Sequence, residues 1–169
     1  DDFAPEPGFA SIFNGRDLTG WSYPDGTAFG GQTTTPDGRF MAKHGRLIVT
    51  VSRADRKTLR IVTTQAFPRD FELRLEFRAS PNADSGIFVR EPQVQCRDYG
   101  IAGPFVHLQQ YRPLDWNKIS ITVKDGVAHA TCNGEVMLDA FTVPATGPIG
   151  LESDRGQMEY RRIRVKKLP

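Results

Sequence analysis

Hydrophobic and polar residues alternate along much of the chain with a period of two. Between Phe71 and Arg78 every second residue is Phe or Leu, and the residues between them are Glu or Arg. Successive side chains of a β-strand point to opposite faces, so this segment is predicted to be a half-buried strand with a charged outer face. Residues 118–124 alternate in the same way, with Ile and Val on the apolar face.

Two dipeptides mark tight turns between strands. Asp125-Gly126 and Asn133-Gly134 supply the positive backbone dihedrals that two-residue hairpin turns require. They predict that residues 118–124, 127–132 and 135–138 form a three-stranded antiparallel meander.

Other short segments with strand character are separated by clusters of Gly, Pro, Asn and Asp. They are Phe40–Ala42, Arg46–Val51, Arg60–Phe67, Ile87–Arg90, Gln93–Arg97, Phe105–Gln109, Ile149–Glu152 and Met158–Val165. Helical spacing is absent beyond one turn near Asp17. Many short strands without crossover helices predict an all-β fold, an antiparallel β-sandwich of two packed sheets. We expect one domain over residues 9–169, preceded by an extension at residues 1–8, with residues 22–38 as the longest loop.

The charge of the chain is nearly balanced, with 22 basic and 20 acidic side chains and a net charge of +2. No long-range field that would draw the protein onto nucleic acid is therefore expected. Basic residues gather between Arg161 and Lys167, where Arg162, Arg164 and Lys166 would share one face of a strand. That face is interpreted either as a solvated or edge-guarding surface or as a site for an anionic partner.

No apolar run approaches the ~20 residues of a membrane-spanning helix, so no membrane span is expected. The first residues contain neither the charged nor the apolar region of a signal peptide. Because the sequence does not begin with Met, one expectation is a mature exported protein, periplasmic or extracellular, whose leader has been removed.

The two cysteines, Cys96 and Cys132, have neither CxxC spacing nor a nearby pair of His residues. The pattern therefore does not support a zinc site. Two interpretations stay open, a disulfide or two small buried thiols on separate strands.

Several short blocks occur in the order that is typical of one family. They are residues 13–21 (FNGRDLTGW), 70–78 (DFELRLEFR), 84–90 (DSGIFVR), 115–117 (DWN), 132–134 (CNG) and 147–152 (GPIGLE). With them the chain resembles the 3-keto-disaccharide hydrolase family from about Phe9 to Leu168. The resemblance implies a concanavalin- and laminin-G-like jelly roll, in a family of mostly exported bacterial domains.

Polar residues on the outward parity of two predicted strands suggest a ligand groove. Gln93, Gln95 and Arg97 alternate with inward Val94 and Cys96, and their amide and guanidinium groups can hydrogen-bond sugar hydroxyls. In the segment 105–109, His107 and Gln109 share a parity opposite to Val106 and Leu108, so they are predicted to face the same groove. The alternative for each strand is an ordinary solvated face.

The resemblance to the family implies further residues for this groove, and it also shows which polar positions of the family are replaced in this chain. In the family a Ser-Gly-Ile-Phe-x-Arg block leads to a strand reading roughly Glu-Val-Gln-Ile-x-Asp, and these polar residues border the sugar cleft. Ser85, Arg90, Gln95 and Asp98 match that pattern, whereas Gln93 replaces the Glu and cannot exchange a proton.

Two His residues of the family pattern are also missing. One precedes the Asn-Gly turn, where His129 lies one step out of phase, and one belongs to a Leu-Gln-x-His-Gly-like block that corresponds to residues 151–156. Active members are understood to open 3-keto-glycosides by acid–base chemistry, with a divalent metal in some of them. A metal site with one matching carboxylate and no matching His would be poorly supplied.

The polar residues also allow other interpretations. Ordinary glycoside hydrolysis would need a second carboxyl beside Asp98, from Glu91 or Glu152, at about 5 to 10 Å across the cleft. Asp84, near Asn82 and Ser85, is either part of a turn or a calcium ligand. Trp21 and Trp116 are expected in the core or at its rim rather than stacked on a sugar.

These observations favour a module without turnover that binds a saccharide or docks onto a protein assembly. The alternative is an active 3-keto-glycoside hydrolase or lyase. In that case Asp98 would be the acid–base group, and Ser85, Arg90, Gln93, Gln95 and His107 would contact the substrate. Neither a cofactor nor a metal is expected from the sequence.

Overall fold

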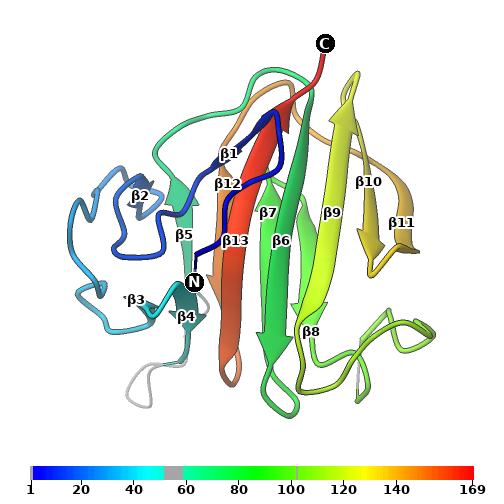
Figure 1. Ribbon diagram of the computed structural model, residues 1–169, viewed down its shortest axis with the longest axis horizontal. Coiled ribbons are helices and arrows are strands. Elements are labelled where there is room, and N and C mark those ends of the chain that lie inside the picture. The colour runs from blue at the N-terminus through cyan, green and yellow to red at the C-terminus, as the bar shows by residue number, and fades with distance from the viewer. Residues whose placement is uncertain (1, 52–58, 102) are drawn as a thin grey trace.

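The computed structural model describes residues 2–51, 59–101 and 103–169. These residues contain strands and no helix (Figure 1). The strands are β1 (Phe9–Ser11), β2 (Trp21–Ser22), β3 (Phe40–Lys43), β4 (Arg46–Val49), β5 (Leu59–Thr63), β6 (Phe71–Ala79), β7 (Asp84–Val89), β8 (Gln93–Arg97), β9 (Asn117–Lys124), β10 (Val127–Cys132), β11 (Glu135–Thr142), β12 (Ile149–Ser153) and β13 (Met158–Lys167).

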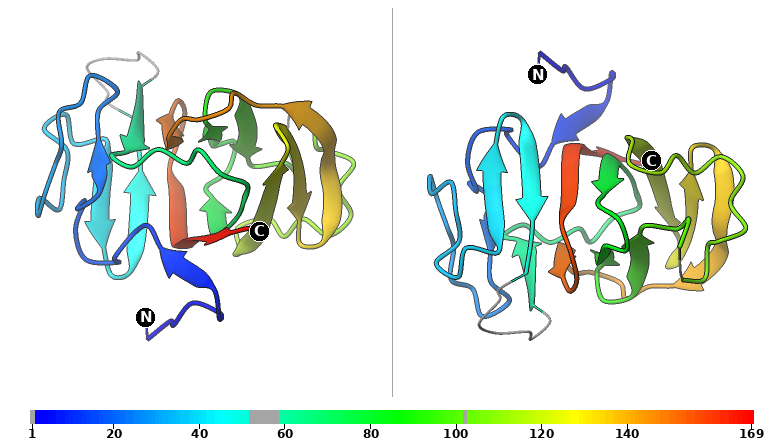
Figure 2. Two further views of the ribbon diagram at one scale, coloured as in Figure 1. Left: turned by 90° about the horizontal axis from the view of Figure 1, so that it is seen from above. Right: turned by 90° about the horizontal axis from the view of Figure 1, so that it is seen from below.

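The strands form two antiparallel sheets that pack as two layers (Figure 2). The large sheet has the order β11-β10-β9-β6-β13-β4-β3, and β1 also pairs with β13. The small sheet has the order β2-β5-β12-β7-β8. Consecutive elements that lie in different sheets, such as β6 and β7, give the jelly-roll architecture that the sequence predicts.

The alternation in β6 has the predicted register. Phe71, Leu73, Leu75 and Phe77 are each at most 1% exposed, and the Glu and Arg residues between them face outward. Leu73 lies opposite Ile121 of β9, and both belong to the single core between the sheets. Removing such side chains from water is the main favourable term that holds the two layers together.

Both predicted hairpin turns are present. Asp125 and Gly126 have φ values of 51° and 75°, and Asn133 and Gly134 have values of 51° and 84°. Asn133 also ties the turn to its surroundings, because its Oδ1 accepts the Lys118 N–H at 2.8 Å and its Nδ2 donates to the Gln110 carbonyl at 2.7 Å. The turn thus anchors a loop as well as reversing the chain.

Strand β13 lies in the middle of the large sheet, so its basic residues do not guard an edge as the sequence had suggested. It pairs with β6 on one side and with β4 and β1 on the other. A bulge between Arg161 and Arg164, with Arg162 at a φ of 56°, interrupts the ladder. Ile163 and Val165 point into the core as predicted.

The N-terminal segment covers part of the basic stripe, which consists of Arg162, Arg164 and Lys166 of β13. Glu6 accepts hydrogen bonds from Arg164 Nε at 2.5 Å and from Arg74 Nη1 at 3.2 Å. The Arg164 guanidinium also lies 5.0 Å from the ring centre of Phe3, and that of Arg74 lies 4.5 Å from the ring centre of Phe9. The hydrogen bond from Arg164 lowers the pKa of Glu6 to about 2.

Residues 105–109 form turns rather than a strand, because the buried pair Phe105 and Leu108 is spaced by three residues and Val106 is 59% exposed.

Cys96 and Cys132 are free and buried, which is the second of the two interpretations for these thiols. Burial raises the pKa of the Cys132 thiol to about 12.

The conformation of Gly134 leads to a first prediction. A Cβ at this position would meet no atom within 4 Å, so the cost of Gly134→Val comes from the left-handed backbone rather than from a clash. We expect a loss of about 1 kcal/mol or more in unfolding free energy, measured by chemical denaturation. Gly31→Val, at an exposed glycine with ordinary φ, is the matched control and should cost less. Equal stability of the two variants would contradict the turn assignment.

The contact between Glu6 and the basic stripe predicts a dependence of stability on pH. Because the folded-state pKa of Glu6 is depressed from 4.5 to about 2, its contribution is present above pH 4.5 and is lost as the pH falls toward 2. The difference in unfolding free energy between wild type and Glu6→Gln should therefore shrink over that interval. It should also shrink at high salt, since the pair is partly exposed. The exposed Glu91→Gln substitution serves as control, and a constant difference for Glu6→Gln would refute the role of the pair.

Candidate functional site

The outward face of the small sheet carries the predicted polar residues of β8 together with side chains from β5, β7 and β12. The antiparallel register places Glu152 of β12 opposite Arg60 of β5 and Gly86 of β7 opposite Gln95 of β8. The inward residues between them, such as Leu151 and Val94, are fully buried. The packed core therefore forces Glu152, Gln93 and Gln95 onto one outward surface.

Gln93 and Glu152 are in direct contact across β7. The Gln93 Nε2 donates a hydrogen bond to the Glu152 Oε2. The Gln93 side chain passes over Gly86, where a Cβ atom would lie only 1.8 Å from its Nε2. Only a glycine at position 86 leaves room for this contact, which explains the glycine in the middle of a strand.

The environment of Glu152 favours its protonated form. Burial raises the pKa of this carboxyl first of all, and the negative charges of Asp154 and Asp84 raise it further, against the opposing effects of Gln93 and Arg60. Burial and Asp154 also raise the pKa of Asp84, although Arg97 Nε lies 3.6 Å from its Oδ1. Carboxyls with raised pKa values in a polar surface are suited to proton transfer.

Gln95, on the outward parity of β8, carries an unsatisfied acceptor. Its Oε1 is buried and has no hydrogen-bond partner among the residues that the structure describes. Its backbone is held in place, because the Tyr99 hydroxyl donates to the Gln95 carbonyl at 2.6 Å. A buried acceptor without a partner is costly, so a ligand hydroxyl that reached this oxygen would relieve that cost.

An aromatic ring borders these polar groups. Phe88 lies on the outward face of β7, and the Arg60 guanidinium lies over it at 4.6 Å from the ring centre. Arg60 also approaches Glu91, with 3.9 Å between Nη2 and Oε1. The surface around Glu152 thus combines a carboxyl, two amides, a cation and a ring.

Ser85, predicted to contact substrate, points into the core instead. It is fully buried, and its hydroxyl donates to the Glu152 backbone carbonyl at 2.7 Å and lies 2.7 Å from the Tyr160 hydroxyl. The reason is parity, because Ser85 shares its face of β7 with the buried Ile87 and Val89. Ser85 supports the strand that carries Glu152 but does not reach the surface.

Arg90 is also a structural residue. Its guanidinium donates to the backbone carbonyls of Phe67 at 2.8 Å, Pro144 at 2.7 Å and Arg69 at 2.9 Å. The side chain is only 6% exposed and follows the end of β7 with a φ of 64°. It fastens two loops to the strand end.

Asp98 and His107 do not join the group around Glu152. The two oxygens of the buried Asp98 accept the Asn82 N–H at 3.0 Å and the Tyr111 hydroxyl at 2.9 Å, so this carboxylate anchors the loop that follows β8. His107 is exposed in that loop, beside Glu135 of β11 in the large sheet. Of the polar residues that the sequence assigns to one groove, Gln93 and Gln95 therefore lie near Glu152, whereas these two residues do not.

Glu152 is the site residue that sequence reasoning undervalued, naming it only as one partner for Asp98. The signal was its position next to the apolar Ile149 and Leu151, which places it on the outward parity.

The segment before Asp84 is a turn, with Asn82 at a φ of 59° and the Ala83 N–H donating to the Ser80 carbonyl at 3.0 Å. In the described part of the chain no group of three or more His, Cys, Asp or Glu side chains could hold a metal ion, so the residues do not fit the divalent metal of some relatives.

Neither Trp residue faces this surface. Trp21 is completely buried, and its Nε1 donates to the Ile12 carbonyl at 3.0 Å. Trp116 lies beneath the guanidinium groups of Arg78 and Arg161, which belong to the outward face of the large sheet. The expectation that both serve packing is consistent with these contacts.

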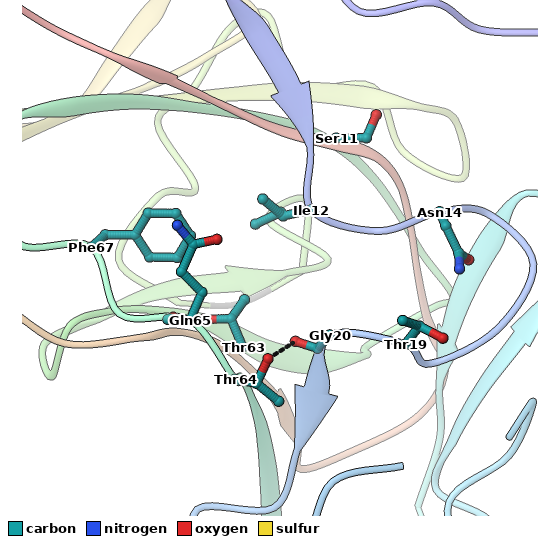
Figure 3. Close-up of a pocket in the computed structure, with 9 residues that line it drawn as sticks. All are labelled: Ser11, Ile12, Asn14, Thr19, Gly20, Thr63, Thr64, Gln65 and Phe67. Carbon is teal, nitrogen blue, oxygen red and sulfur yellow. Dashed lines mark hydrogen bonds between the residues drawn. The ribbon is translucent and has the colours of Figure 1, made fainter. Parts of the chain in front are cut away.

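A separate cleft of about 230 Å³ lies beside the block 13–21 (Figure 3). The residues that line it in the described chain are uncharged, and two of its hydroxyls are already engaged. Thr63 Oγ1 donates to the Gln65 carbonyl at 2.7 Å and Thr64 Oγ1 to the Gly20 carbonyl at 3.3 Å. This cleft has no group that could transfer a proton, in contrast to the surface around Glu152.

No helix in the described residues is long and apolar enough to cross a membrane.

Solved structures with the same architecture include carbohydrate-related proteins. A protein from Parabacteroides distasonis, provisionally assigned as a glycosyl hydrolase, is 18% identical with a TM-score of 0.73, over 96% of this chain and 94% of that chain. The carbohydrate-binding module CBM66 from Bacillus subtilis is 12% identical with a TM-score of 0.53, over 89% and 97% of the two chains. The β-glucanase of Bacillus licheniformis is 10% identical with a TM-score of 0.59, over 95% and 97%. At these identities the likeness shows the fold.

Sequence comparison is more specific. No curated protein sequence matches the chain significantly. The model of one protein family, however, matches residues 8–166, which is nearly the whole chain and includes all the blocks from residue 13 to residue 152. The chain therefore belongs to the family of 3-keto-alpha-glucoside-1,2-lyase-like domains.

Proposed function

We propose that this domain cleaves 3-keto-glucosides by acid–base elimination, with Glu152 as the catalytic acid–base group. The observation that carries this proposal is the half-buried Glu152 carboxyl, whose pKa is raised by burial and by the charges of Asp154 and Asp84. A base with a pKa nearer to neutrality transfers protons more effectively than an ordinary solvated glutamate.

The chemistry follows from the ketone. A carbonyl at C3 of the sugar acidifies the hydrogen on C2, and the Glu152 carboxylate removes that hydrogen as a proton. The electron pair left on C2 forms the C1–C2 double bond, and the oxygen at C1 departs with the aglycone. A proton completes the alcohol that leaves, either from the now protonated Glu152 or from water. The bond that breaks is thus the glycosidic C1–O bond, and no redox step is needed.

The neighbours of Glu152 have positioning roles in this proposal. Gln93 holds the carboxylate through its Nε2. The unpartnered Oε1 of Gln95 would accept a sugar hydroxyl, and the ring of Phe88 would border the sugar. Arg60 lies opposite Glu152 and would face the negative charge that develops on the enolate oxygen.

The apparent loss of the family carboxylate at Gln93 has an explanation in this arrangement. In the family pattern the strand of Gln93 begins with Glu and the block of Glu152 contains Gln. Here the two residue types stand in each other's places, and their side chains are in contact. One carboxyl and one amide are therefore retained on the same surface, which removes the main argument against catalysis.

Saccharide binding without turnover is the second candidate function. It is favoured by the two amides and the ring at the surface, which suffice for recognition of sugar hydroxyls. Docking onto a protein assembly has no comparable support from the residues around Glu152.

The proposal is tested by turnover of a 3-keto-glucoside, followed by release of the aglycone. Glu152→Gln should lower kcat about 10²–10⁴-fold while substrate binding, measured by titration calorimetry, persists. Asp139→Asn, the corresponding change from carboxylate to amide at an exposed position of β11 in the large sheet, is the matched control and should be nearly silent. The double exchange Gln93→Glu with Glu152→Gln should recover activity over Glu152→Gln alone. Saccharide binding by wild type with no turnover would overturn the catalytic proposal in favour of the second candidate.

The environment of Glu152 also predicts the pH dependence. Because the base must be ionised, kcat should rise with pH through a midpoint above the ordinary Glu value of 4.5. Asp154→Asn removes a negative charge that raises the Glu152 pKa, so the midpoint should move to lower pH. A midpoint that does not move, or that moves upward, would show that another group controls the rate.

A further inference from the structure

A second concave surface lies on the outward face of the large sheet. This arginine cleft, as we call it, has a volume of about 370 Å³ and is lined by His44, Gly45, Arg46, Arg78, Trp116 and Arg161. Its residues come from the β3–β4 turn, from β4, β6 and β13, and from the residue that precedes β9. The cleft lies on the outward face of the large sheet and Glu152 on the outward face of the small sheet, so the two are on opposite sides of the sandwich.

Two carboxylates, one buried and one partly buried, hold the guanidinium groups in place. Glu159 accepts from Arg46 Nη1 at 2.7 Å through one oxygen and from Arg78 Nε at 2.6 Å through the other. Glu76 accepts from Arg161 Nε at 2.6 Å and also interacts with Arg162 Nη1 at 3.3 Å. The glutamate side chains are 10% and 17% exposed, so they lie beneath the arginines rather than in front of them.

The cleft keeps an excess of positive charge after these pairs are counted. The three arginines that line the cleft, Arg46, Arg78 and Arg161, are paired with only two carboxylates, and their guanidinium groups carry more N–H donors than these carboxylates accept from them. The side chains of Arg46, Arg78 and Arg161 remain 28%, 35% and 24% exposed, so a ligand can reach them while water screens them only in part.

The arginines are also preorganised by the indole. Arg161 lies 3.9 Å and Arg78 lies 4.8 Å from the ring of Trp116. The rim is formed by a tight turn in which His44 and Gly45 have φ values of 51° and 75°. Guanidinium groups that are fixed in advance lose little entropy when they bind a planar or tetrahedral oxyanion.

We propose that the arginine cleft binds the oxyanion group of a small molecule, a carboxylate, sulfate or phosphate, at a site distinct from the surface around Glu152. The volume of the cleft lies within the range of small-molecule sites. A nearly balanced net charge of +2 gives no field for nucleic acid, which favours a local anion over a polyanion. The site would recognise acidic sugars or free inorganic anions by the same chemistry.

Trp116 provides the measurement. It is half-buried beneath the two arginines, whereas Trp21 is fully buried in the core and should respond little. Tryptophan emission is followed while glucuronate, inorganic sulfate, inorganic phosphate and neutral glucose are titrated separately at constant ionic strength. We expect a saturable change with the anions and none with glucose. Tighter binding of glucuronate than of sulfate or phosphate would identify an acidic sugar as the ligand class, and the reverse order a free inorganic anion.

Matched variants locate the response. Arg46→Gln should weaken anion binding roughly tenfold or more. Glu159→Gln, which removes a competing carboxylate, should strengthen it. Lys124→Gln removes an exposed positive charge elsewhere on the large sheet and should leave it unchanged. Unfolding temperatures show whether each variant is folded, and because the first two variants act in opposite directions, instability in one leaves the other as a test. No saturable response to any anion, or an equal loss in Lys124→Gln, would overturn the proposal.

Discussion

The alternation of β-strand side chains between two faces is the constraint on which the rest of the structure depends. In the small sheet, the burial of Val94, Ile87 and Leu151 leaves the neighbouring residues no orientation other than outward. Glu152 and Gln93 therefore meet on one surface because their neighbours pack the core. A shift of one residue in β12 would bury Glu152 and expose Leu151, so the stability of the core and the position of the carboxyl are the same requirement.

Gly86 connects that constraint to the chemistry of the surface. The strands of a sheet are separated by about 4.8 Å, so a side chain on β8 reaches β12 only by crossing β7. The absence of a Cβ at Gly86 opens this path for Gln93. The amide then holds one carboxylate oxygen of Glu152, while Ser85 on the reverse face of β7 bonds the Glu152 backbone carbonyl. Glu152 is thus held at its carboxylate from the outward face of β7 and at its backbone from the inward face.

Sequence reasoning was accurate where burial alone determines orientation. The alternation in β6 and the Asn133-Gly134 turn follow from local chemistry, and both are present. It was wrong for Ser85, where a motif was preferred to the parity that Ile87 and Val89 already indicated. Arg90 and Asp98 could not be assigned from sequence, because each is satisfied by groups distant along the chain, such as Pro144 and Tyr111. The contact of Glu6 with Arg164 spans nearly the whole chain and has no local signal.

Two glutamates show how the same side chain acquires different roles in this fold. Glu6 lies against Arg164 and Arg74, and the hydrogen bond from Arg164 depresses its pKa, so its charge holds the N-terminal segment on the large sheet. Glu152 is half-buried beside Asp84 and Asp154, with a neutral amide as its hydrogen-bonded partner, and its pKa is raised. Guanidinium groups stabilise the ionised form of a carboxylate, so such a carboxylate binds a proton weakly and is a poor base. A carboxylate whose charge is disfavoured gains when it takes a proton, and of these two glutamates only Glu152 has that environment.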